Sequence, residues 1–306
     1  MSVLIVGSVA LDSVITPIEK HDDLLGGSAS FAAVSASFFS PVNLVGVVGD
    51  DFPKEHIAYF QSRNVDLSGL QIVPGATMRW TGEYEWDLNV RHTRHIALNV
   101  FEHFTPVIPE SFKKPAITLL ANIAPGLQSH VLDQVPEPRF VIADTMDLWI
   151  NIAAGDLANL LKRVDLLILN DSEARLLTKD NSLIRAARTI QDMGPKYVAI
   201  KKGEHGCLLF GPSAFFSCGA YPLEEIRDPT GAGDTFAGGF AGYLASLPPD
   251  GEIAFSQLKQ AVVHGSVMAS FNVEAFSLER LRTLDAAQIA ERYKGFQTMT
   301  DFTSLS

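Results

Sequence analysis

Short runs of Val, Ile and Leu recur along the chain, and most are continuous instead of alternating with polar residues. Continuous runs indicate strands buried on both faces, as in a parallel sheet that helices cover. We therefore expect core strands at residues 3–6, 42–48, 117–120, 140–143, 164–169, 197–200 and 207–210.

Segments with apolar residues three to four positions apart lie between these runs, which is the spacing of an amphipathic helix. We expect helices at residues 28–39, 53–62, 156–164, 182–193, 234–247, 255–271 and 285–293. Alternation of strands and helices predicts an α/β fold, a doubly wound and mainly parallel sheet flanked by helices with right-handed crossovers.

One region, residues 77–101, breaks this rhythm with strict alternation. This pattern predicts a half-exposed antiparallel strand, followed by a second strand at 93–100 with Asn89 in the turn. A small β-sheet therefore interrupts the series, and its aromatic face either packs on the main domain or a second subunit, or contacts a ligand. The aromatic face carries Trp80, Gly82, Tyr84 and Trp86, and the polar face carries Thr81, Glu83, Glu85 and Asp87.

Composition narrows the class of protein. The 306 residues are 47% hydrophobic and 19% charged, which excludes a disordered or fibrous chain. No repeat or long linker divides them, so we expect a single domain over 1–306. The 24 basic and 35 acidic residues give a net charge of −11, which disfavours nucleic acid as a partner.

The first residues and the two cysteines indicate the cellular compartment. The chain begins with a pattern typical of a strand and reaches Asp12 without a basic segment, so we expect no signal peptide. No run approaches the roughly 18 apolar residues of a membrane span. Cys207 and Cys218 lie in apolar surroundings as expected of buried thiols, and we expect a cytoplasmic protein.

The most informative segment is residues 228–240, with the sequence DPTGAGDTFAGGF. Gly231 and Gly233 permit close approach to the backbone just before an apolar helix, whose free N–H groups attract phosphate. Asp234 lies in the same turn, where a carboxylate is suited to accept a proton from an alcohol that attacks phosphorus. The pattern indicates phosphoryl transfer, and the alternative is that Asp234 only caps the helix.

Two other glycine loops do not fit this segment. A Walker A loop needs a lysine directly after its last glycine, where this chain has Asp234. A dinucleotide fingerprint needs a third glycine where this chain has Phe236, and an apolar strand where residues 223–227 are mixed and charged. ATP hydrolysis of the P-loop type and NAD binding are thus disfavoured.

The segment resembles the C-terminal signature of the ribokinase-like, PfkB-type carbohydrate kinase family. Further matches in family order span nearly the whole chain. They are residues 26–30 (GGSAS), 45–52 (VGVVGDDF), 170–173 (NDSE) and 202–207 (KGEHGC).

The resemblance implies a catalytic centre at Asp234. The carboxylate is the base for the acceptor hydroxyl, and the amides of Gly231, Ala232 and Gly233 form an anion hole for the γ-phosphoryl group of ATP. Glu173 holds water around Mg²⁺, unless it only caps a helix with Asn170. The nucleotide-binding set implied by the family is Asn170, Lys202, Gly203, Gly206, Thr230, Val263, His264 and Val267.

Four of these nucleotide residues also have an ordinary explanation. Gly203 and Gly206 fit a hairpin turn, Lys202 fits a solvated side chain, and His264 fits a packing residue. Lys201 and Lys202 also replace the more usual apolar or hydroxyl residue before the first of these glycines.

On the acceptor side, the resemblance gives Asp12 the hydroxyl-binding role, with an exposed turn residue as the alternative. Gly26 and Gly27 let the acceptor approach the backbone, and Phe31 stands where many relatives have a sugar-binding asparagine. The small sheet, with residues of about 13–25 and 76–103, corresponds to the family's lid, through which some members form homodimers. Asp228, with residues 272–277, is a candidate frame for a monovalent cation such as K⁺.

Together these features predict an ATP-dependent kinase for a hydroxyl of a sugar or sugar-like molecule. Phe31 and the aromatic lid favour a nucleoside or cyclitol acceptor as the alternative. A second alternative is a non-catalytic sensor that binds a sugar or nucleotide, against which the intact Asp234 argues. From the resemblance we also expect a homodimer through the lid.

Overall fold

The computed structural model describes residues 1–248 and 251–301, and these form two β-sheets. In this part of the chain the larger sheet has nine strands in the order β13-β12-β11-β10-β9-β8-β1-β4-β5. All neighbours from β11 to β5 are parallel, and β12 and β13 add an antiparallel edge. The strands are β1 (Val3–Val6), β4 (Val42–Gly49), β5 (Val65–Val73), β8 (Ile117–Leu120), β9 (Val141–Asp144), β10 (Leu166–Asn170), β11 (Tyr197–Lys201), β12 (Cys207–Phe210) and β13 (Phe215–Cys218).

The continuous apolar runs are explained by burial on both faces of this sheet. Val3 and Ile5 of β1 face one hydrophobic core, whereas Leu4 and Val6 face the other. Burial of both faces removes the need for alternating polar residues. The prediction of a doubly wound, mainly parallel sheet is confirmed.

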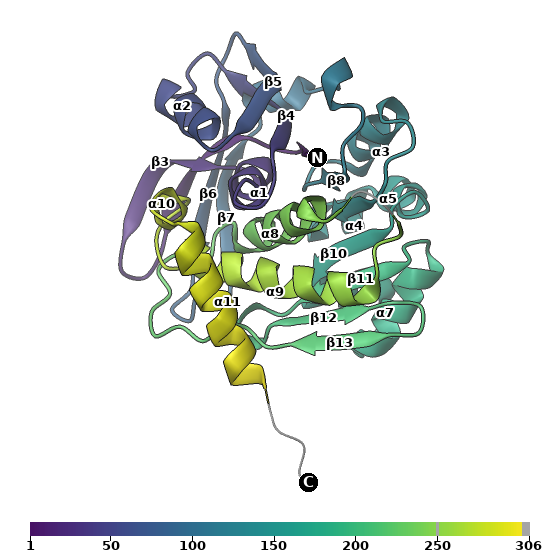
Figure 1. Cartoon of the computed structure of the whole chain (residues 1–306). Helices are drawn as coiled ribbons and strands as arrows, with labels where there is room; N and C mark the ends of the chain where they lie inside the picture. The colour runs from purple at the N-terminus through teal and green to yellow at the C-terminus, as the bar shows by residue number, and fades with distance from the viewer. Residues whose placement is uncertain (249–250, 302–306) are drawn as a thin grey trace.

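Helices cover the two faces. Figure 1 shows α1, α8 and α9 packed side by side. The first face carries α1 (Ser28–Ala36), α2 (Lys54–Ser62), α8 (Ala232–Ser246), α9 (Phe255–Asn272), α10 (Glu279–Arg282) and α11 (Ala286–Thr300). The second carries α3 (Pro125–Gln134), α4 (Asp147–Ile152), α5 (Ala154–Leu161), α6 (Asp171–Thr178) and α7 (Leu183–Asp192). Among the described residues, no helix has the length and apolarity to cross a membrane.

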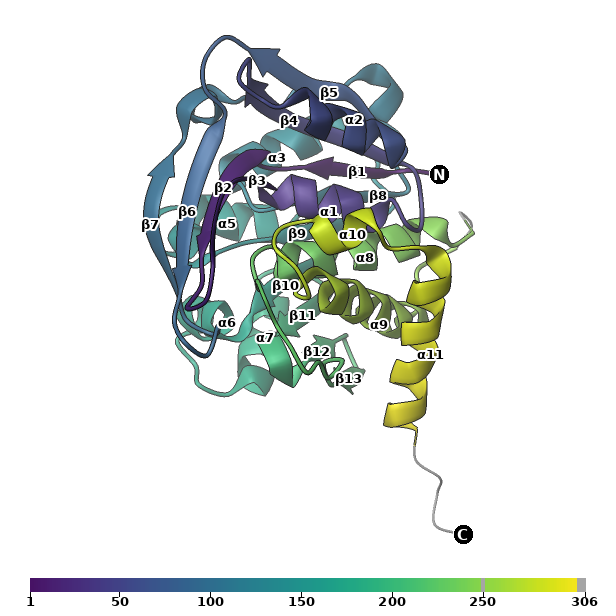
Figure 2. The ribbon, with the colours of Figure 1, turned by 90° about the vertical axis from the view of Figure 1, so that its left-hand side faces the viewer.

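The small sheet has the strand order β3-β2-β6-β7. Figure 2 shows it along one side of the molecule, beyond the end toward which β1 points. The expected interruption of the α/β series is confirmed. Its strands are β2 (Ala10–Ile15), β3 (Lys20–Gly26), β6 (Met78–Tyr84) and β7 (Arg91–Ala97).

Two details of the predicted small sheet are wrong. Trp86 does not extend the aromatic face, because β6 ends at Tyr84 and Trp86 is 85% exposed in the turn that follows. The turn closes when the Val90 carbonyl accepts from the Glu85 N–H, with Leu88 at a φ of 59°. The partner strand therefore begins at Arg91, and the segment expected to complete it forms the short helix η1 (Asn99–His103).

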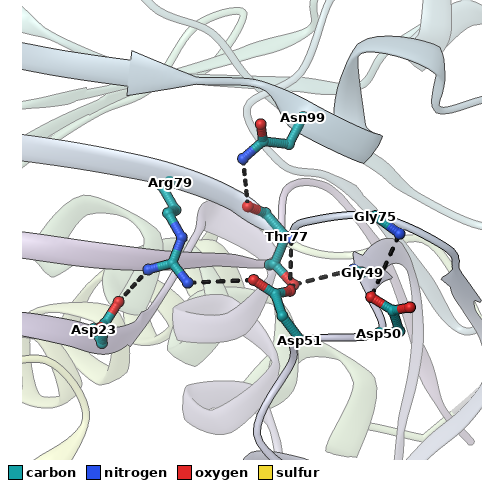
Figure 3. A network of polar contacts seen from close by, with 8 residues as sticks. All are labelled: Asp23, Gly49, Asp50, Asp51, Gly75, Thr77, Arg79 and Asn99. Atoms are coloured by element: carbon teal, nitrogen blue, oxygen red, sulfur yellow. Dashed lines mark hydrogen bonds and ion pairs between the residues drawn. The ribbon is translucent and has the colours of Figure 1, made fainter.

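A polar joint fixes the small sheet to the main sheet (Figure 3). The backbone N–H and the hydroxyl of Thr77 donate to Asp51 Oδ1 at 2.7 and 2.6 Å, and Arg79 Nη2 donates to Asp51 Oδ2 at 3.2 Å. Thr77 Oγ1 accepts from the Gly49 N–H at 3.0 Å, and Asn99 Nδ2 donates to the Thr77 carbonyl. Residues before β6 and after β7 are thus tied to the loop that follows β4.

Candidate active site

Polar residues follow or end several strands of the main sheet. Asp144, Asn170 and Lys201 are the last residues of β9, β10 and β11, which are parallel neighbours. The carboxyl ends of parallel strands lie at one edge, where doubly wound folds bind ligands. The chain passes from this edge of β1 into β2, which carries Asp12. This arrangement brings together residues that are far apart in the sequence.

Helix α8 begins within the glycine-rich loop. Gly231 precedes it in the left-handed region at a φ of 73°, and a Cβ atom there would lie 2.4 Å from the Phe31 ring. Glycine is therefore required both by the backbone and by the close contact. Asp234 lies in the first turn of α8. The N–H groups of this turn have no acceptor within the helix.

The anion hole implied by the resemblance needs one correction. The Ala232 N–H already donates to the Pro229 carbonyl at 3.2 Å, so it is not free for a phosphate. Within the described chain, the amides of Gly231 and Gly233 have no such recorded acceptor. The turn that starts the helix therefore engages the Ala232 amide and leaves the amides of Gly231 and Gly233 for a phosphate.

The Asp234 carboxyl lies among other charged groups. Burial and the nearby Asp144 carboxylate raise its pKa to about 7, against the effects of Lys201 and Arg91. A carboxyl with a pKa near neutrality is suited to exchange a proton at physiological pH. Arg91, the first residue of β7, brings the small sheet into this site.

Asp12 is buried, with 6% of its surface exposed, and is not an exposed turn residue. Burial raises its pKa to about 7, and the Asp228 and Asp234 carboxylates add to this effect. Asp12 and Asp234 are therefore within electrostatic reach of each other.

The double glycine makes room for Asp12 itself. A Cβ atom at Gly26 would lie 2.0 Å from Asp12 Oδ2, and the Gly27 N–H donates to that oxygen at 3.4 Å. Gly27 has a φ of 91°, and a Cβ atom there would lie 2.5 Å from the Ser8 carbonyl. These contacts, which the sequence did not reveal, explain both glycines without an acceptor.

Phe31 is buried in the structure, and its expected contact with the acceptor stays a prediction. Its side chain is 2% exposed and lies against Gly231, beneath the loop that precedes α8. An aromatic ring in this place supports the loop by packing.

Asn170 and Glu173 form a capping box at the start of α6. Asn170 Oδ1 accepts from the Glu173 N–H at 2.8 Å, and Glu173 Oε2 accepts from the Asn170 N–H at 2.7 Å. Burial raises the pKa of Glu173 to about 7, although Lys201 lowers it. The capping alternative is therefore present in the structure, and it leaves Glu173 Oε1 without a recorded hydrogen bond in the described part.

The structure adds Lys201 and Asp144 to the site, which the sequence did not single out as functional. Lys201 Nζ lies 3.5 Å from Asp144 Oδ2, and their side chains are 18% and 6% exposed. Burial lowers the pKa of Lys201, but Asp144, Glu173 and Asp234 outweigh it and raise the pKa. Their positions at the ends of two buried strands were the available signal.

The turn at 203–206 is a short 3-10 turn before β12. Its backbone is closed by the Lys202 N–H, which donates to the Gly206 carbonyl at 2.7 Å. A Cβ atom at Gly206 would lie 2.0 Å from the Cys218 carbonyl, whereas Gly203 is exposed with open space beside it. Gly203 is thus accessible to a ligand, while Gly206 is required by packing against β13.

His264 and Val267 have packing roles in the structure, and their expected place beside a nucleotide stays a prediction. The His264 ring is stacked between Tyr243 and Tyr293, with centroid separations of 4.3 and 4.4 Å, so both of its faces are covered. Val267 is fully buried in the core, and the partly buried Val263 packs against the same core. This stretch of α9 holds helices together.

Thr230 and Asp228 are occupied within the protein. The Thr230 N–H donates to Asp228 Oδ1 at 2.8 Å, and the Thr230 carbonyl accepts from Asn272 Nδ2 at 2.8 Å. Asp228 Oδ2 accepts from the Ser277 N–H at 3.0 Å. These bonds brace the loop before α8, and the nucleotide role expected of Thr230 stays a prediction. A cation role for Asp228 remains a prediction.

The acidic side chains of the site do not form a protein cage for a metal ion among the described residues. No group of three or more His, Cys, Asp or Glu side chains there is arranged to hold a metal ion. The excess of carboxylates around Lys201 nevertheless suits a hydrated divalent cation that is also bound by phosphate oxygens, since Mg²⁺ keeps several of its waters. The donor set fits Mg²⁺ through water and not through a protein cage.

Comparison with known proteins decides the family. The pfkB family carbohydrate kinase profile matches residues 108–281. A cytidine kinase of Thermococcus kodakarensis is 33% identical over 256 residues, covering 81% of this chain and 90% of that protein. The chain belongs to the pfkB family of carbohydrate kinases.

Two further similar proteins extend the comparison. A 2-dehydro-3-deoxygluconokinase of Thermoproteus tenax is 25% identical, covering 81% of this chain and 80% of that protein. Arabidopsis thaliana ribokinase, solved with ribose and ATP, shares the fold with a TM-score of 0.76 at 21% identity, covering 95% of this chain and 98% of that one. This pfkB protein is thus a kinase of ribokinase-like architecture, as the sequence motifs predicted.

Proposed function

We propose that this protein transfers the γ-phosphoryl group of ATP to a hydroxyl of a small acceptor, with Asp234 as the general base. The observation that carries the proposal is the meeting of Asp234, the free amides of Gly231 and Gly233, and Asp12 in one region. These groups supply a proton acceptor, donors for a phosphoryl group and a carboxylate suited to acceptor hydroxyls.

In this reaction a hydroxyl bound near Asp12 is deprotonated by Asp234 as its oxygen approaches phosphorus. The amides of Gly231 and Gly233 donate to the phosphoryl oxygens, whose charge builds during transfer. Removal of one such donor typically raises a barrier by about 3 to 4 kcal/mol. Asp12 orients the acceptor, and the small sheet acts as a lid that excludes water.

ATP is the proposed donor because ribokinase of Arabidopsis was solved with ATP, and because the site offers amides and a lysine for phosphates. Glu173 and Asn170 would hold hydrated Mg²⁺, with Gly203 beside the nucleotide. When bound, Mg²⁺ neutralises phosphate charge. Lys202 remains a prediction for the nucleotide site.

For the acceptor we favour a nucleoside. The cytidine kinase aligns over 90% of its length at 33% identity, which supports a ribose-bearing acceptor with a base. Phe31 adds no support to this choice, because its ring is buried in the structure. Asp12 suits the vicinal hydroxyls of a ribose.

A sugar acid or free sugar is the second candidate. The relative from Thermoproteus tenax is a 2-dehydro-3-deoxygluconokinase, and Arg91 from the small sheet lies near Asp12 and Asp234. A guanidinium in this place suits an acceptor that carries a carboxylate or phosphate.

The proposal is tested by ADP formation with Mg-ATP and a panel of acceptors: cytidine, adenosine, ribose, 2-dehydro-3-deoxygluconate and inositol. We expect acceptor-dependent turnover with a nucleoside, its loss in Asp234→Asn and its retention in Asp192→Asn, which changes an exposed aspartate of α7. Tight acceptor binding without turnover by the wild-type protein would instead support a non-catalytic sensor.

A further inference from the structure

The Lys201 ammonium lies over the start of α8. A Cβ atom at Gly233 would lie 2.8 Å from Lys201 Nζ, so this nitrogen sits beside the backbone that carries a free amide. The lysine comes from the end of β11, a buried strand that fixes its backbone. Two independent elements therefore place positive groups at one point.

The closeness of the Lys201 ammonium to the N-terminus of α8 is unfavourable unless negative charge lies between them. A helix N-terminus carries about half a positive charge, and it repels a nearby ammonium. The ammonium is held there by the carboxylates of Asp144, Glu173 and Asp234, which raise its pKa.

The ammonium is not saturated by these carboxylates. An ammonium has three N–H donors, and its ion pair with Asp144 is long, at 3.5 Å. One Glu173 oxygen is already engaged by the Asn170 N–H. Donors therefore remain for an acceptor located at the amides of α8.

We propose that Lys201 binds the phosphoryl group undergoing transfer, and that this lysine distinguishes a nucleoside triphosphate from a diphosphate. This inference rests on the proposed function. As the acceptor oxygen bonds to phosphorus, the bond from phosphorus to the ADP oxygen breaks, and the hydroxyl proton passes to Asp234. Lys201 stays protonated throughout and donates to oxygens of the transferred group.

Lys202 does not share this position. It follows the last residue of β11 and adopts the backbone that opens the turn to Gly206. Its backbone N–H closes that turn, and within the described chain its side chain has no recorded ion pair. The sequence motif favoured Lys202, whereas its neighbour Lys201 is the lysine that enters the site.

The test is calorimetric binding of ADP and of a non-hydrolysable, methylene-bridged ATP analogue, both with Mg²⁺. We expect wild-type protein to bind the analogue more tightly than ADP. In Lys201→Met the affinity for the analogue should fall tenfold or more, while the affinity for ADP changes less than threefold. Lys201→Arg, which keeps the charge, should restore part of the difference.

The matched control is Lys196→Met, which removes an exposed lysine just before the opposite end of the same strand. It should bind both nucleotides as wild type does, and circular dichroism should show all variants folded. The inference is overturned if wild type binds the analogue no more tightly than ADP, or if Lys201→Met weakens both nucleotides equally. Retention of the preference by Lys201→Met also overturns it.

The binding data, taken together with the assay of ADP formation, separate this inference from the proposed function. Loss of the analogue preference in Lys201→Met, with no acceptor-dependent ADP formation by wild type, supports a triphosphate site and contradicts the kinase proposal. Acceptor-dependent turnover in wild type, with an unchanged preference in Lys201→Met, supports the kinase and contradicts the role of Lys201.

Discussion

The Tyr84 hydroxyl lies 3.0 Å from Thr230 Oγ1, and both residues are 8% exposed. Tyr84 ends β6 of the small sheet, whereas Thr230 directly precedes Gly231 at the start of α8. This buried hydrogen bond joins the proposed lid to the loop that carries the free amides. The position of the small sheet is thereby coupled to the geometry of the site.

Tyr84→Phe should loosen this connection. A buried hydrogen bond contributes about 1 kcal/mol, and a partner left unsatisfied costs about 1 to 3 kcal/mol. We expect the free energy of unfolding to decrease by an amount in this range, as measured by urea denaturation. We also expect the KM of the acceptor to rise in steady-state kinetics.

Thr230→Val completes a double-mutant cycle for this pair. If the two hydroxyl groups stabilise the protein through each other, the double variant should be less destabilised than the sum of the single variants. Strict additivity of the two changes would contradict the coupling between the small sheet and the loop.

Asp234→Asn should abolish turnover, because an amide does not accept the acceptor proton. In wild type, kcat/KM should rise with pH through about 7, the pKa to which burial and Asp144 raise this carboxyl, since only the ionised form is a base. A pH series of initial rates checks this, and a rate that declines from pH 6 to pH 8 contradicts it.

The same substitution should change stability in a defined direction. The pKa of Asp234 is raised in the folded state, so the proton favours folding, and this contribution is lost as pH rises from about 4 to about 7. Asp234→Asn should therefore melt at a higher temperature than wild type at pH 8, with a smaller difference at pH 5. Differential scanning calorimetry at both pH values measures this.

Gly231→Ala should damage both fold and site. The φ of 73° costs a residue other than glycine about 1 to 3 kcal/mol, and the new Cβ atom would lie 2.4 Å from the Phe31 ring. We expect a lower free energy of unfolding and a lower kcat. Gly155→Ala is the matched control, because a Cβ atom there meets nothing within 4 Å; equal losses in both variants would contradict the explanation.

The sequence predicted the sheet well because two-sided burial leaves a clear signal. The runs at β1, β8 and β12 have the predicted bounds, and others differ by a residue or two. The edge strand β5 gave no continuous run, since several of its residues are exposed. Periodicity therefore detects strands whose faces are both covered and misses those at the edge.

The site was predictable only where a local motif marks it. Gly231 to Asp234 form a contiguous signature, so their position at the start of a helix followed from the sequence. Lys201 and Asp144 are separated by 57 positions and meet only because β11 and β9 lie on either side of β10. Nothing local in the sequence indicated that Tyr243 and Tyr293 would cover the His264 ring.

The stacked His264 gives the protein a sensitivity to acid that is independent of the catalytic groups. Burial lowers its pKa to about 4 from the ordinary 6.5, so the folded state resists protonation. The neutral His264 ring contributes fully to stability above pH 6.5, and this contribution is lost as pH falls to about 4. The free energy of unfolding decreases by at most about 3 kcal/mol over this interval. His264→Phe keeps an aromatic ring between the tyrosines and removes the titration. We expect this variant to lose less stability than wild type between pH 7 and pH 4.5 in urea denaturation, and parallel losses in the two proteins would show that His264 does not titrate with folding.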